Sequence, residues 1–105
     1  MAKKPKRPRT VRREAERDAL ALARDRERLF ELERGGSPER PIDVAAASVV
    51  EVGARAVECP RCNGQHHLDE HVAVVIKGMR LREARLTCKE CGSHRSLWFR
   101  LAELN

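Results

Sequence analysis

Two cysteine pairs with the same internal spacing are the residues of this chain best suited to chemistry. They lie in Cys59-Pro-Arg-Cys62 and Cys88-Lys-Glu-Cys91, with 25 residues between the pairs. Two intervening residues let one tight turn aim both sulfurs at a single ion, and backbone amides of the same turn can hydrogen-bond the sulfurs. Zinc takes four ligands in a tetrahedron, and thiolate sulfurs suit it. The spacing therefore favours metal binding.

A redox role is the main alternative for a Cys-x-x-Cys motif. Such a motif normally opens a helix after a strand and occurs once in a chain. Here it occurs twice, on either side of a segment that we expect to form a hairpin, so redox chemistry fits badly. We expect a cytoplasmic protein, because no secretory signal is visible and no stretch approaches the roughly 20 apolar residues of a membrane span. In a reducing compartment, four cysteines indicate metal ligands or redox centres before disulfides.

The segment between the cysteine pairs has the pattern of a β-hairpin. Alternating apolar residues run to Ile76, Lys77-Gly78 can form a two-residue turn, and alternation resumes at Met79. This register places Ile76 opposite Met79, Val74 opposite Leu81 and Glu70 opposite Arg85. Leu86 then falls on the wrong face, which predicts a bulge near residues 84–86. A third strand is expected at residues 95–101, and the two cysteine turns then meet at the open end of the hairpin.

Residues 57–101 resemble the zinc ribbon superfamily, which includes rubredoxin-like modules with four cysteine ligands. The resemblance rests on CPRCNG and CKECG around a hairpin and on the closing strand SLWFRL. It implies that one structural Zn²⁺ is held by Cys59, Cys62, Cys88 and Cys91. Iron also suits a tetrahedral set of four sulfurs and stays open. Small bacterial proteins in which a charged helix leads into a ribbon look similar to the chain as a whole.

The remaining polar residues do not suggest an active site. Four cysteines close a tetrahedral site and leave no position for water or substrate. We therefore expect His66, His67, His71 and His94 to lie on the surface or beside the cysteine turns. The Asp69-Glu70 pair has no partner that would make it an acid–base pair. No catalytic residue and no enzyme activity are expected.

The part of the chain before the cysteines divides into three segments by composition. Residues 1–9 are basic and proline-containing, and we expect a disordered tail. Residues 10–34 are predicted to form a charged helix that Thr10 caps and Gly35-Gly36 ends. Residues 35–56 are interpreted as a linker with one or two short strands, at 42–44 and 48–52, and residues 57–105 as the ribbon. The predicted fold class is small α+β: a charged N-terminal helix, then a three-stranded antiparallel zinc ribbon with one or two extra short strands.

The net charge of +6 is concentrated at the N-terminus. Seven cationic residues precede the first acid, Glu14, and the rest of the chain holds 15 basic and 16 acidic residues, a balance of −1. A polyanion-binding argument therefore applies to the N-terminal arm and not to the folded part.

These features support two interpretations of function. The first is a small zinc-binding protein that acts as an interaction module and docks on a larger protein. The alternative is nucleic-acid binding, in which the basic arm holds phosphates and a positive sheet face carries one stacking aromatic. The candidate contact residues are Lys3, Lys4, Lys6, Arg7, Arg9, Arg80, Arg82, Trp98 and Arg100. Ala15, Leu22 and Leu29 recur every seven residues, which also suggests weak homodimerisation through residues 10–34.

Overall fold

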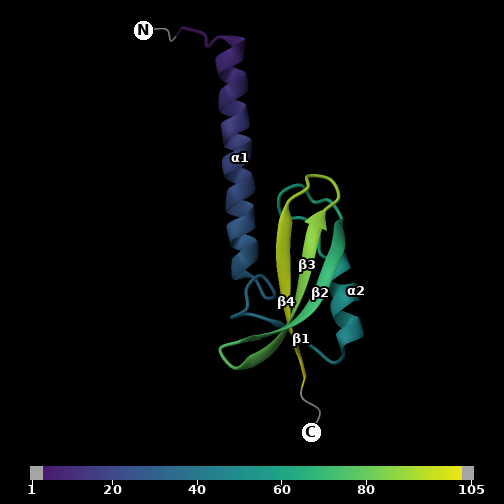
Figure 1. Ribbon diagram of the computed structural model, residues 1–105. Coiled ribbons are helices and arrows are strands. Elements are labelled where there is room, and N and C mark those ends of the chain that lie inside the picture. The colour runs from purple at the N-terminus through teal and green to yellow at the C-terminus, as the bar shows by residue number, and fades with distance from the viewer. Residues whose placement is uncertain (1–3, 103–105) are drawn as a thin grey trace.

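A computed structural model describes residues 4–102 of the chain. A long helix leads into a small α+β unit, and the helix projects beyond that unit at its N-terminal end (Figure 1). The molecule is correspondingly elongated, with a longest axis of 73 Å. Lys3, a candidate contact of the basic arm, lies outside the described residues.

The first helix, α1, spans Pro8–Leu32 and confirms the charged helix expected at residues 10–34. It begins two residues earlier than predicted, and no side chain caps it: Arg7 is extended and Pro8 opens the helix. Proline suits a first helical position because the N–H that it lacks would have no intrahelical partner there. No side chain of α1 is fully buried. Leu22 and Leu29 are 51% and 60% exposed, so the row of apolar residues spaced seven positions apart faces solvent.

The segment after α1 corrects one prediction. Strand β1 forms at Ile42–Val44 as expected, but residues 48–52 are not a strand. They belong to helix α2, which spans Ala47–Ala56 and buries Val50 and Ala54 completely. These two positions are four residues apart and therefore share one face of a helix. The valines and Gly53 weaken helix propensity, but burial of this face against the sheet outweighs a cost of about 1 kcal/mol or less per residue.

A four-stranded mixed sheet forms the rest of the molecule. Strands β2 (His66–Ile76), β3 (Met79–Cys88) and β4 (His94–Leu101) are antiparallel, as predicted. The expected three-stranded sheet is extended by β1, which pairs with β4 in parallel and gives the order β1-β4-β3-β2. In the chain, β1 comes before α2. It pairs with β4 at one edge of the sheet, and α2 then crosses one face of the sheet.

The hairpin register is confirmed, and the bulge is displaced. Ile76 pairs with Met79, Val74 with Leu81 and Glu70 with Arg85, and the last pair is an ion pair of 2.7 Å. The register shift lies between Leu68 and Glu70 in β2, not near residues 84–86 of β3. The additional residue, Asp69, lets Leu68 pair with Leu86. Without it, the register set by the turn would direct Leu68 to the face opposite to Leu86, and with it both side chains reach the core.

The hydrophobic core lies between α2 and one face of the sheet. Val50 and Ala54 of α2 belong to one buried cluster with Ala84, Leu86, Leu97 and Phe99. Trp98 lies between Leu97 and Phe99, which are both buried in the core, and therefore points to the other face. There it is half-buried beside the segment of residues 36–38, whereas Phe99 packs in the core with Val44 and Val50.

Within residues 4–102, no helix combines the length and the apolar character that crossing a membrane requires.

Candidate metal centre

The four cysteines meet at one end of the sheet. One sulfur from each of Cys59, Cys62, Cys88 and Cys91 lies within 4.8 Å of all the others. The Sγ atoms of Cys59 and Cys91 are 3.7 Å apart, and those of Cys62 and Cys88 are 3.4 Å apart. Sulfurs about 2.3 Å from a tetrahedral ion are about 3.8 Å from one another. All four thiols are free, and the donor set therefore fits a single tetrahedral metal ion.

Two turns of the same construction supply the sulfurs. The N–H of Asn63 donates to the carbonyl of Cys59 at 2.8 Å, and the N–H of Gly92 donates to the carbonyl of Cys88 at 3.0 Å. Asn63 and Gly92 occupy equivalent positions with φ of 60° and 74°. The left-handed conformation expected after each second cysteine is thus adopted by asparagine in one turn and by glycine in the other.

Gly64 follows the first turn and is required for a different reason. Its φ is not positive, but an added Cβ would come within 2.5 Å of the Glu90 side chain and 3.0 Å of the Cys88 sulfur. Any side chain here would push the two cysteine turns apart. The absence of a side chain at residue 64 lets both sulfur pairs reach one ion.

The surroundings shift the pKa values of three of the cysteine thiols in different directions. Burial acts to raise the pKa of Cys59, but hydrogen bonds from the Ser93 hydroxyl and from the backbone of Cys62 and Arg61 outweigh burial and lower that pKa to about 6. The Ser93 hydroxyl also lowers the pKa of Cys91. The hydrogen bond with Cys88 raises the pKa of Cys62 to about 12. Negative charge therefore collects on Cys59 and Cys91, on the Ser93 side of the centre.

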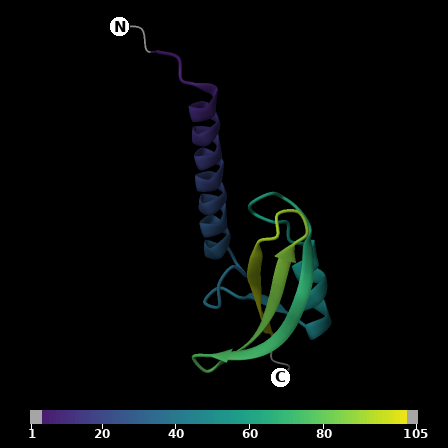
Figure 2. The same ribbon diagram turned by 45° about the horizontal axis from the view of Figure 1, so that its top comes forward.

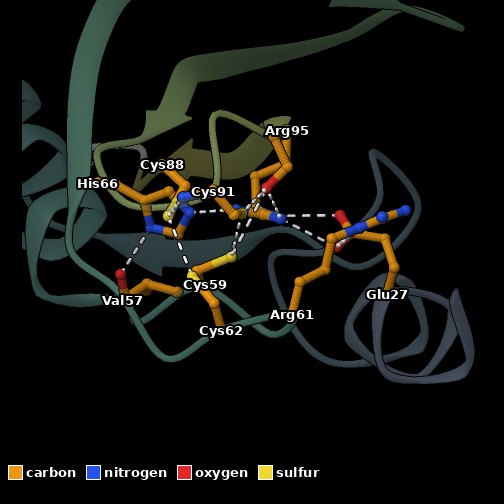
Figure 3. Close-up of polar contacts among 10 residues, drawn as sticks. Glu27, Val57, Cys59, Arg61, Cys62, His66, Cys88, Cys91 and Arg95 are labelled. Carbon is orange, nitrogen blue, oxygen red and sulfur yellow. Dashed lines mark hydrogen bonds and ion pairs between the residues drawn. The ribbon is translucent and has the colours of Figure 1, made fainter. Parts of the chain in front are cut away.

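A partly buried chain of hydrogen bonds connects this side of the centre to α1. The Ser93 Oγ lies 3.0 Å from the Cys91 sulfur and 3.6 Å from the Cys59 sulfur, and it accepts a hydrogen bond of 2.8 Å from Arg95. Arg95 forms a two-pronged ion pair with Glu27 of α1, at 3.1 and 2.9 Å. The Arg95 side chain is only 3% exposed. Glu27 also faces Arg61 of the first cysteine turn at 3.4 Å (Figure 3).

His66 completes the network with a defined tautomer. Its Nδ1 lies 2.7 Å from the carbonyl oxygen of Val57, which can only accept, so Nδ1 carries the hydrogen. Its Nε2 then accepts from the guanidinium of Arg95. His66 is buried. Its bond to Val57 joins the start of β2 to the chain just before Cys59 (Figure 3).

The other candidate residues lie away from this centre. In the part of the chain that the structure describes, the cluster of metal-binding groups contains the four cysteines and no histidine. Lys4, Arg7 and Arg9 are exposed at the start of the chain, and Lys6 pairs with Glu14 at 2.8 Å. Arg82 pairs with Phe99 and Glu83 with Trp98 in the sheet register. Arg80 and Arg82 therefore project from the face opposite to Trp98 and Arg100, and the four residues do not form one basic and aromatic face.

Glu27, Ser93 and Arg95 were not predicted to belong to the centre. Only the position of Ser93, two residues after Cys91, could have indicated a role. Glu27 and Arg95 are 68 positions apart, and both lie among many other charged residues.

Comparisons with protein-family models, with curated proteins and with solved structures find no match for this chain. Its function is therefore inferred from the geometry of the centre and of the surfaces around it.

Proposed function

We propose that this protein is a zinc-ribbon-like interaction module in which Cys59, Cys62, Cys88 and Cys91 hold one structural Zn²⁺. The observation that carries the proposal is the convergence of four sulfurs within 4.8 Å from two turns of like construction. Four thiolates complete the preferred coordination of zinc. No position then remains on the ion for a substrate, which favours a structural and not a catalytic role.

The expected energy of such a site supports a structural role. Structural zinc in small fingers contributes an apparent 10–16 kcal/mol, roughly, and whole domains are stable by about 5–15 kcal/mol. The sulfurs join the segment before β2 to the end of β3 and the β3–β4 turn. One ion would therefore fasten all three antiparallel strands at one end.

Metal analysis of the purified protein tests this assignment. Elemental analysis of protein expressed in metal-supplemented medium is expected to give one zinc per chain, and Cys88→Ser is expected to lower that content strongly. Ser48→Ala, on the exposed side of α2, is the matched control. Stoichiometric iron with its visible absorption would replace zinc in the proposal, and the absence of any bound metal would overturn the proposal.

The interaction role is supported by surfaces that the fold leaves uncovered. Helix α1 buries no side chain completely and exposes Val11, Leu20 and Leu22. Trp98 lies half-buried on the sheet face opposite to α2. Partner capture by zinc-loaded protein, compared with Trp98→Ala at equal zinc content, tests the sheet face. Equal capture by both proteins would remove Trp98 from the proposed interface.

The nucleic-acid alternative is supported by the exposed cations at the start of the chain. Binding through this arm should weaken steeply as salt rises and should largely vanish when residues 1–13 are deleted. The lack of a shared face for Arg82 and Trp98 reduces the support for this alternative, because stacking and phosphate contacts would be on opposite sides of the sheet. Absence of binding at low salt would eliminate this alternative.

A further inference from the structure

A large groove lies at the end of the sheet away from the cysteines. It has a volume of about 1120 Å³ and lies between the end of the β2–β3 hairpin and the C-terminal end of β4. The hairpin extends past the other strands and curves away from them (Figure 2). Residues from both sides line this groove, including Asp43, Arg80, Leu81, Arg82 and Arg100.

One wall of this groove is an unpaired strand edge. The pairing of β3 with β4 ends at Arg82 and Phe99. Residues 79–81 of β3 pair with β2 on one side, and among the described residues they have no backbone partner on the other side. Hydrogen-bonded and non-hydrogen-bonded pairs alternate along β2 and β3 from the two-residue turn, so within residues 79–81 the N–H and C=O of Arg80 point to the open side. An extended chain can pair with such free groups.

The charge of the groove favours an acidic occupant. Three arginines and one aspartate line it. The aspartate, Asp43, is already paired with Arg100 at 2.7 Å. Within residues 4–102, Arg80 and Arg82 have no carboxylate at ion-pair distance. The two are separated by one residue on a strand, so their side chains lie on the same face.

The apolar part of the lining favours a peptide over a nucleic acid. It is aliphatic, with Val74, Met79, Leu81 and Leu101 among its residues, and contains no aromatic ring. Binding of single-stranded nucleic acid usually depends on aromatic side chains that stack on bases. An extended peptide instead needs a free backbone edge and small apolar contacts for alternate side chains, and the groove provides both.

We propose that this groove binds an extended acidic peptide segment of a partner protein, which lies along residues 79–81 of β3 and pairs with the backbone of Arg80. The proposal rests on the proposed function as an interaction module and names the chemistry of the partner. Because side chains alternate along a strand, an acidic residue of the peptide opposite Arg80 would lie on the face that also carries Arg82, whose own partner on this side is Phe99. The apolar residues before and after that acidic residue would face the side of Met79 and Leu81.

Fluorescence anisotropy with short labelled peptides tests the groove in the full-length, zinc-loaded protein. The probe alternates glutamate and valine. A second peptide of the same composition places all glutamates before all valines, and a third replaces glutamate with lysine. We expect the alternating acidic peptide to bind more tightly than both others and to protect the amide of Arg80, which points to the open side of β3, from hydrogen exchange.

Charge reversal at the groove supplies the matched comparison. Arg80→Glu with Arg82→Glu should weaken binding of the alternating acidic peptide by about tenfold or more, since the cross-strand pair at Arg80 becomes repulsive and the second reversed charge lies on the same face. Arg28→Glu with Arg55→Glu changes the net charge equally at exposed positions outside the groove and should leave the affinity nearly unchanged.

Three outcomes would overturn the groove proposal: no binding of the alternating peptide, equal binding by the reversed variant, or preferential binding of labelled oligothymidine at this site. Zinc content and the far-UV spectrum are measured on the same samples. Failure of the groove proposal therefore appears as lost or unspecific peptide binding by a metal-loaded, folded protein. Failure of the proposed function appears instead as missing metal.

Discussion

At the scale of single residues, Ser93 is the side chain that joins the cysteine sulfurs to the rest of the molecule. Arg95 donates to its oxygen, so the hydroxyl hydrogen of Ser93 is free to point at the nearby sulfurs of Cys91 and Cys59. A hydroxyl that donates to thiolates disperses their charge and orients them toward the ion. Partners of this kind typically change metal affinity by about 10- to 100-fold.

We therefore expect Ser93→Ala to lower the affinity for zinc by about 10- to 100-fold without abolishing binding. Competition with a chromophoric chelator measures the change. Ser48→Ala, on the exposed side of α2, should bind zinc as the unmodified protein does. An unchanged affinity in Ser93→Ala would show that the hydroxyl does not contribute to zinc binding.

Zinc binding should also depend on pH in a defined direction. The lowered pKa of Cys59, about 6 against an ordinary 9.0, favours its thiolate in the fold. That stabilisation is fully present above the ordinary pKa and is lost as the pH falls through about 6. Protons also compete directly with the metal for thiolates.

We expect zinc to be retained at neutral pH and to be released as the pH falls below about 6. A zinc-sensitive dye in a pH titration measures the release. Release that begins at neutral pH would contradict the expected preference for the thiolate.

At the scale of elements, the position of α1 depends on Glu27. This helix buries no side chain fully, and its ion pair with Arg95 connects it to the centre. The side chains of that pair are 16% and 3% exposed, so solvent screens the interaction weakly. Phe30 adds a contact, with the Arg95 guanidinium 6.0 Å from its ring centre.

Replacement of Glu27 by glutamine should detach α1 from the sheet while the helix and the zinc are retained. Loss of hydrogen bonds to a charged partner is expected to lower the free energy of unfolding by about 1.5–3 kcal/mol. Spin labels on α1 and β4 would report a broader distribution of distances. Asp25→Asn, on the exposed side of α1, is the control, and an identical distribution in both variants would argue against a role for Glu27.

The same scale shows where local patterns failed to predict the elements. The β2–β3 register was predictable because a two-residue turn determines every pairing up to the bulge, and Lys77 and Gly78 adopt the positive φ values of 49° and 79° that such a turn needs. The helix at residues 47–56 was missed because valine and glycine favour other conformations. Its formation depends on Phe99 and Leu97, whose positions no local pattern contains.

At the scale of the whole molecule, the metal is expected to decide whether the sheet folds. We predict that chelation, or Cys88→Ser, unfolds the three antiparallel strands, since about 10–16 kcal/mol from a structural zinc is comparable to the entire stability of a small domain. Far-UV spectra and protease sensitivity after verified metal removal measure this. A native-like spectrum together with protease resistance in the metal-free protein would contradict the prediction.

The amino-acid order by itself determined the four-cysteine cluster, the hairpin register and the long charged helix. Each depends on residues a few positions apart, whose spacing fixes a turn or the face of an element. Only the tertiary structure decided that residues 47–56 are helical, that β1 pairs in parallel with β4, and that Glu27 reaches the centre through Arg95 and Ser93. These features arise from burial and pairing between segments distant in the chain, as the 68 positions between Glu27 and Arg95 illustrate. The stabilising free energy of these contacts therefore arises only once the chain has folded.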